Sequence, residues 1–117
     1  MRVRWWWVLG LVLLGSGRAA AINVYEVKVQ SEADVLVYLV DQEALADVKV
    51  YNSKSASDGK SESGLIWYFT TFRAYAKLKV FYVQYPFQAD LLVFYVDRDF
   101  KALWVNQAKK VQFGDRF

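Results

Sequence analysis

From Ile22 to Leu103 the sequence is a tandem repeat of thirteen residues. Written from Ile22, the rows are INVYEVKVQSEAD, VLVYLVDQEALAD and VKVYNSKSASDGK, then an insertion SESG at 61–64, then LIWYFTTFRAYAK, LKVFYVQYPFQAD and LLVFYVDRDFKAL. A fixed period of this kind is the strongest constraint on what such a chain can fold into. The period describes how the chain is built, but it names no reaction.

Four columns of the repeat are restricted in residue type. Columns one and three contain only Ile, Val and Leu apart from Trp67. The fourth column is aromatic throughout and contains Tyr25, Tyr38, Tyr51, Tyr68, Phe81 and Phe94. The twelfth column allows only the smallest side chains and contains Ala33, Ala46, Gly59, Ala76, Ala89 and Ala102.

Columns one to six predict a β-strand, because they are rich in β-branched and aromatic residues. Side chains alternate along a strand, so columns one and three lie on one face and columns four and six on the other. Both faces are apolar, and we therefore expect strands that are covered on both sides. Columns seven to eleven are polar and include Pro86, which predicts a surface turn or a short helical turn.

The small residues of column twelve predict a close approach between two backbone segments, where a larger side chain would collide. We expect the substitution Ala89→Leu to destabilise the fold by about 1–3 kcal/mol on that account.

Two parts of the chain depart from the repeat. Residues 52–64 are almost entirely polar and predict a flexible loop between two similar halves of three rows each. After Ala102 the register fades, and Trp104, Val105, Val111 and Phe113 predict one or two irregular strands that end at Gly114. The expected organisation is a single β domain over 22–113 with a short tail at 114–117, because a chain of this length can bury one core only.

Residues 1–21 have the layout of a secretory signal peptide. A basic start, which includes Arg2 and Arg4, precedes an unbroken apolar run and a segment of small residues. Cleavage after Ala21 places Ala19 and Ala21 where the peptidase needs small side chains. The alternative is an uncleaved membrane anchor, although the run is shorter than the roughly 20 apolar residues that span a bilayer. Cleavage predicts export to the periplasm or the medium.

The leader also carries the whole net charge of +3, and without its three arginines twelve basic and twelve acidic residues remain. The balance leaves no positive excess for phosphate backbones or anionic lipid, so we expect no nucleic-acid partner. The sequence contains no cysteine, so an exported chain must be stable without disulfides. Nothing in the sequence indicates a cofactor, and we expect a monomer with no membrane span after cleavage.

The sequence contains neither histidine nor cysteine, which removes the usual nucleophile–base pairs and zinc ligands. Asp97 and Asp99 indicate either ligands for a hard cation or a solvated turn that Arg98 neutralises. The recurrent aspartates of column thirteen are Asp34, Asp47 and Asp90. They are typical of turn residues that bind nearby backbone amides.

Several aromatic residues lie outside the fourth column, namely Tyr75, Tyr82, Tyr85, Phe87, Tyr95 and Phe100. They form either a stacking platform for sugars or bases or ordinary core and rim packing. We therefore expect a structural or interaction module without catalysis. The alternatives are an extracytoplasmic protein that binds carbohydrate or an envelope component through surface tyrosines or the 52–64 loop, and an enzyme that uses carboxylates alone.

The pattern V-x-V-Y-x-V followed by a turn ending in A-D, seen in VLVYLVDQEALAD and LKVFYVQYPFQAD, resembles the septoil-knot family of small, mostly bacterial proteins. The resemblance covers residues 22 to about 113 and implies a chain wound repeatedly through itself into a deep torus knot. The architectural alternative is a short open β-solenoid, whose ends would need caps. The polar third row, its insertion and Trp67 depart from the family pattern, so the path of the chain near the loop stays open.

Overall fold

The computed structural model describes residues 21–55 and 64–117, which form a mainly β domain. Its strands are β1 (Ile22–Glu26), β2 (Val35–Leu39), β3 (Val48–Asn52), β4 (Ile66–Phe69), β5 (Leu78–Tyr82), β6 (Leu91–Val96) and β7 (Leu103–Trp104). Short 3₁₀ turns follow five of them, namely η1 (Gln30–Glu32), η2 (Glu43–Leu45), η3 (Arg73–Tyr75), η4 (Pro86–Gln88) and η5 (Asp99–Lys101). The chain continues through α2 (Gln107–Phe113) and η6 (Gly114–Arg116). The prediction of strands joined by turns or short helical turns is confirmed.

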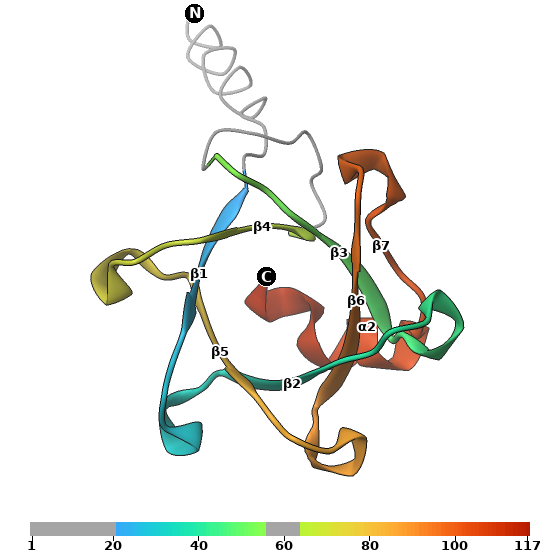
Figure 1. Cartoon of the computed structure of the whole chain (residues 1–117), viewed down its shortest axis with the longest axis horizontal. Coiled ribbons are helices and arrows are strands. Elements are labelled where there is room, and N and C mark those ends of the chain that lie inside the picture. Colours follow the sequence, from blue (N-terminus) through green and yellow to red (C-terminus); the bar gives the residue numbers. More distant parts are fainter. Residues whose placement is uncertain (1–20, 56–63) are drawn as a thin grey trace, which may run out of the picture.

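Strands β1 to β6 close into a ring, in which each strand is parallel to both of its neighbours (Figure 1). The order around the ring is β1, β5, β2, β6, β3, β4 and back to β1. Strand β7 adds an antiparallel pairing to the beginning of β3. A closed barrel leaves no open sheet edge, so the open solenoid considered from the sequence is wrong.

Within each half of the repeat, strands that are consecutive in sequence lie two places apart in the ring, whereas β3 and β4, which join the halves, are neighbours. The chain makes one circuit with β1, β2 and β3, and β4, β5 and β6 then occupy the gaps between them. The two halves predicted from the repeat are therefore interleaved rather than side by side. The link between the two circuits includes residues 56–63, which lie outside the described residues.

The register advances by two residues between neighbours: Val24 of β1 pairs with Leu78 of β5, and Val80 of β5 pairs with Val35 of β2. The first residue of β2 therefore lies level with the last residue of β1, although β5 separates them. We call the segment that joins two strands, columns seven to thirteen, a corner. A corner does not have to return along the length of the barrel to reach the next strand of the chain. Parallel strands usually need a connection of about a dozen residues or more, and the stagger of the closed barrel makes the shorter corner sufficient.

Columns one and three fill the interior of the barrel. Their buried members are Val24, Val35, Val37, Val48, Val50, Leu65, Trp67, Leu78, Val80, Leu91 and Val93. On the outer face the fourth column is only half-buried, whereas Val27, Val83 and Val96 of the sixth column are buried. The prediction that both faces of the strands are covered is thus confirmed for the inner face and only in part for the outer face.

The small residue of column twelve ends each 3₁₀ turn, and the residue after it joins a distant strand. Ala46, which is buried, donates its N–H to Glu43 at 3.1 Å, and Asp47 donates its N–H to the carbonyl of Leu92 at 2.7 Å. Among the described members of column twelve, Ala46 is buried, whereas Ala33, Ala76, Ala89 and Ala102 are half-buried. The close approach at this column, and with it the cost of Ala89→Leu, stays a prediction. Of this column, Gly59 lies outside the described residues.

We expect Ala46→Leu to destabilise the protein by about 1–3 kcal/mol, because the added atoms have no room beside the crossing strand. Ala44→Leu is the matched control, since Ala44 is exposed in the same corner, and it should change stability by less than about 0.5 kcal/mol. The measurement is the midpoint of denaturant unfolding followed by circular dichroism. Equal midpoints for the two variants would show that column twelve is not sterically restricted.

The end of the chain differs from the sequence prediction. Trp104 lies in a strand as expected, but Val111 and Phe113 belong to the helix α2 rather than to a strand. Asn106 begins this helix, because its side chain accepts hydrogen bonds from the N–H groups of Ala108 and Lys109. The segment after Gly114 also packs inward, with Phe117 buried.

Candidate binding site

The amino end of the barrel is covered by the chain's own C-terminal segment, α2 and η6. Lys109 donates to the carbonyl of Asp90 at 2.8 Å, and Lys77 donates to the carbonyl of Phe117 at 2.7 Å. The Phe117 ring lies 5.6 Å from the ring of Trp67, measured between centroids. Figure 1 shows the C-terminus inside the ring of strands. This end of the interior is therefore filled by protein.

Column five forms the carboxyl end of the barrel. We call this end the mouth. The members of column five are Glu26, Leu39, Asn52, Phe69, Tyr82 and Tyr95. Side-chain alternation places column five on the same inward face as columns one and three. Phe69, Tyr82 and Tyr95 pack against the core, whereas Glu26 and Asn52 are exposed. The apolar interior therefore ends in a polar and aromatic rim.

A pocket of about 520 Å³ opens at the mouth. Four members of column five line it, namely Glu26, Asn52, Phe69 and Tyr82. The other lining residues lie at or just after the ends of β1 and β4, namely Tyr25, Lys28, Thr70 and Thr71. The strands that supply Glu26, Asn52, Phe69 and Tyr82 are consecutive neighbours in the ring. Sites at the carboxyl ends of parallel strands are common in sheets of this kind.

The hydroxyls of Tyr82 and Tyr95 share a hydrogen bond of 2.8 Å at the base of the mouth. Burial raises the pKa of both phenols above the usual value of 10.0, and the charge of Glu26 makes a smaller contribution in the same direction. Both groups therefore stay protonated at neutral pH. The pair has two O–H protons and uses one in the mutual hydrogen bond, so one O–H can donate elsewhere.

The tyrosine pair predicts a loss of stability in alkaline solution. The unfolded chain releases the Tyr95 proton near pH 10, whereas the folded protein retains it, so the stabilisation is complete below that pH and declines as pH rises. We expect the free energy of unfolding to fall between about pH 9 and pH 11, and Tyr95→Phe to make this fall shallower. Denaturant unfolding across the pH range measures the slope. An unchanged slope in the variant would contradict the assignment.

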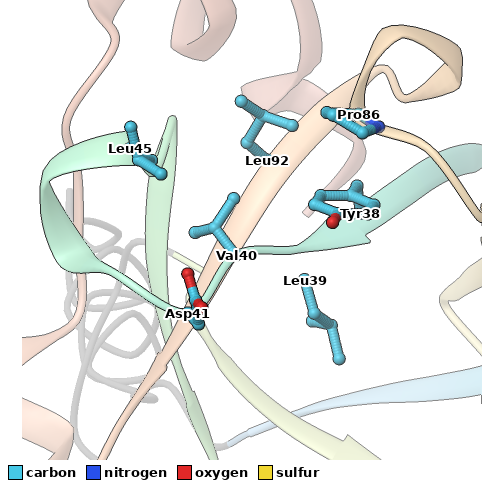
Figure 2. Close-up of a pocket in the computed structure, with 7 residues that line it drawn as sticks. All are labelled: Tyr38, Leu39, Val40, Asp41, Leu45, Pro86 and Leu92. Atoms are coloured by element: carbon cyan, nitrogen blue, oxygen red, sulfur yellow. The ribbon is translucent and has the colours of Figure 1, made fainter.

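An apolar groove lies on the flank of the barrel, between the corners that contain η2 and η4 (Figure 2). It has a volume of about 450 Å³ and is lined by Tyr38, Leu39, Val40, Asp41, Leu45, Pro86 and Leu92. Asp41 supplies the one acidic side chain of this lining. The groove offers hydrophobic contact area but few groups that could orient a polar ligand.

The aromatic residues singled out from the sequence divide into two sets. Tyr82 and Tyr95 lie at the mouth, whereas Tyr75, Tyr85, Phe87 and Phe100 are exposed on the corners. Tyr85 and Phe87 stack with their ring centroids 5.6 Å apart, and Tyr75 lies 5.5 Å from Phe72. The aromatic corners alternate with those of η1 and η2 around the ring, so they do not form one platform (Figure 1).

The acidic pair of the last corner belongs to the scaffold in the structure. Lys101 forms an ion pair with Asp97 at 3.0 Å, and its hydrogen bond lowers the pKa of that carboxyl. Arg98, expected to neutralise the turn, donates to the backbone carbonyl of Asp97, and its charge makes a smaller contribution to the lowered pKa of the Asp97 carboxyl. Among the residues that the structure describes, no group of three acidic side chains gathers to hold a metal ion.

The column-thirteen aspartates bind distant backbone amides, so the prediction of nearby partners is wrong. The bonds run from the N–H of Lys79 to Asp34 at 2.8 Å, from Leu92 to Asp47 at 3.0 Å and from Leu36 to Asp90 at 2.8 Å. Each carboxylate accepts from the strand that its own backbone N–H also joins. The winding brings these strands together, which local turn chemistry cannot reveal.

Other residues named from the sequence have little structural description. Ala19 and the loop residues 56–63 lie outside the described ranges, and Ala21 directly precedes β1. In the described part of the chain, no helix has the length and apolar character needed to cross a membrane.

The mouth was not predicted as a site, because column five shares no residue type. One signal was available: Glu26 and Asn52 are polar residues on the face that alternation assigns to the core. Departures from the inward apolar pattern mark the point where the core ends.

Comparison with known proteins identifies a family. A family described as the 7(1) septoil knot domain matches residues 21–105. The match contains β1 to β7 and ends before α2, so the helix that covers the amino end lies beyond it. No significant match was found among curated proteins or among solved structures.

Proposed function

We propose that this chain, which belongs to the family of the 7(1) septoil knot domain with the matched residues spanning the whole barrel, is a non-enzymatic, exported interaction module. The interleaved barrel is the scaffold, and the mouth is the surface that binds. The entwined core confers resistance to unfolding and proteolysis outside the cytoplasm.

The asymmetry of the two barrel ends carries the proposal. One end is filled by the chain's own α2 and η6, and the other opens into a pocket with mixed polar and aromatic lining. The raised pKa of Tyr82 and Tyr95 keeps both phenols protonated, so neither can act as a general base at neutral pH. Binding is therefore the function that the mouth supports best.

Export is supported by the boundary between the leader and the domain. Strand β1 begins at Ile22, and the family match begins at residue 21. The predicted cleavage after Ala21 therefore coincides with the start of the first strand. N-terminal sequencing of the protein purified from an extracytoplasmic fraction should give Ile22 as the first residue. A protein that still begins at Met1 would contradict cleavage.

Retention of the protein on immobilised cell-envelope material tests the binding function. Asn52→Trp places a large side chain in the mouth and should reduce retention, because Asn52 is exposed and lines the pocket. The control is Gln42→Trp, which adds the same side chain to an exposed corner. If both variants and the parent are retained equally, binding through the mouth is contradicted. If none of the three proteins is retained, the proposed binding function is contradicted.

The alternative from the sequence, a carbohydrate or envelope ligand bound by surface tyrosines or the 52–64 loop, is supported at two positions. For the tyrosines, Tyr25 and Tyr82 line the pocket at the mouth; for the loop, its first residue, Asn52, does so. The corner tyrosines are spread around the ring, which makes them a weaker candidate for a single small ligand.

A further inference from the structure

We propose that the mouth binds an uncharged saccharide, with one sugar ring seated between the end of β1 and the end of β4. The inference rests on the proposed function as an interaction module and specifies its ligand class. It is drawn from the donors, acceptors, charges and aromatic faces that line the pocket.

The lining offers hydrogen-bond donors and acceptors in one small space. Glu26 contributes acceptors only, Lys28 donors only, and the amide of Asn52 contributes both. Thr71 adds a hydroxyl, and the tyrosine pair has one O–H beyond its mutual bond. Neighbouring hydroxyls on a sugar ring both donate and accept, so they match a mixed lining better than a ligand with donors alone or acceptors alone.

The charges of the pocket favour a neutral ligand. Glu26 and Lys28 are the charged side chains in its lining, and they carry opposite signs. An anionic ligand would meet the Glu26 carboxylate, and a cationic ligand would meet the Lys28 ammonium group. Each would bring into the pocket one charge that the lining does not balance. A polyhydroxyl ligand without charge avoids this cost.

Three aromatic residues, Tyr25, Phe69 and Tyr82, also line the pocket. Phe69 and Tyr82 are fixed by packing against the core, so their orientation does not have to be set upon binding. Aromatic faces accept the apolar C–H face of a sugar ring, while its hydroxyls reach the polar groups. A volume of about 520 Å³ lies in the usual range for small-molecule pockets.

A titration of ¹⁵N-labelled protein, monitored by NMR, tests the inference. The probes are the neutral trisaccharides cellotriose, maltotriose and chitotriose, with galacturonic acid and choline as the charged comparisons. At least one trisaccharide should shift the amide signals of Glu26, Asn52 and Phe69, and the charged probes should not. Asn52→Ala and Glu26→Gln should each weaken the binding about tenfold, because the first removes the amide and the second replaces one acceptor oxygen of the carboxylate with an NH2 donor.

Matched controls separate the mouth from the corners. Glu43→Gln makes the same change as Glu26→Gln on an exposed corner and should leave the titration unaltered. Sugar binding that is lost in Phe87→Ala but retained in Asn52→Ala would overturn the assignment to the mouth. Binding of choline or galacturonic acid in preference to every trisaccharide would overturn the ligand class.

The failure of this inference is distinguishable from the failure of the proposed function. If no trisaccharide shifts the mouth signals while Asn52→Trp still abolishes retention on envelope material, the saccharide inference is wrong and the interaction module stands. If retention is absent as well, both are overturned.

Discussion

Replacing Trp67 by valine is expected to destabilise the folded protein by about 2–4 kcal/mol, although valine stands in the same column of the other five rows. Trp67 is fully buried, and its ring meets the rings of Phe69, Tyr95 and Phe117 at centroid distances of 6.2, 6.4 and 5.6 Å. Valine would leave a cavity between the barrel and the C-terminal segment, and the surrounding side chains would close it only in part.

The unfolding midpoint in guanidinium chloride, followed by circular dichroism, measures this effect without relying on the fluorescence of the tryptophan that is removed. Trp67→Phe is the matched control, because it retains a ring against Phe117 and should cost clearly less. If Trp67→Val unfolded at the same midpoint as the parent, the contact between the barrel and Phe117 would contribute nothing.

Replacing Gly64 by alanine is expected to cost about 2–4 kcal/mol, because strain and collision act together. Gly64 has a φ of +77°, a conformation that residues with a Cβ seldom adopt. A Cβ there would lie 2.7 Å from the Cβ of Phe117 and 2.8 Å from its carbonyl carbon. One of these is a backbone atom, so the C-terminal segment would have to move as a unit.

Gly114→Ala is the control for this substitution. Gly114 has a φ of −58°, and an added Cβ would meet only the side chain of Lys110 at 3.6 Å. This variant should be neutral or slightly stabilising, since alanine restricts the unfolded chain more than glycine does. Thermal unfolding and limited proteolysis between α2 and the end of the chain measure both variants. Equal stability of the two would contradict the close packing of Gly64 against Phe117.

The composition of the repeat was sufficient to predict its local structure. The β-branched columns form strands, columns one and three form the core, and Pro86 lies in a 3₁₀ turn as its missing N–H and fixed φ favour. The family resemblance is confirmed as well. These features depend on residues that are close together in the sequence, so the repeat pattern is sufficient to predict them.

The C-terminal segment was predicted less well. Val111 and Phe113 are apolar two residues apart, which favours a strand, yet they lie in a helix. The N-cap formed by Asn106 and the inward packing of Phe113 and Phe117 outweigh the local pattern. The site at the mouth was not predicted either. Its position depends on where the core ends, which is a property of the tertiary structure.

The sequence by itself determined the unit, which is one strand and one corner, and the face of each strand that enters the core. Only the tertiary structure decided which strands are neighbours. Backbone hydrogen bonds join any two similar strands equally well, so six rows with the same strand pattern do not specify their own order. The closure of the barrel and its stagger of two residues per junction select the interleaved order. That order brings Glu26, Asn52, Phe69 and Tyr82 to one mouth.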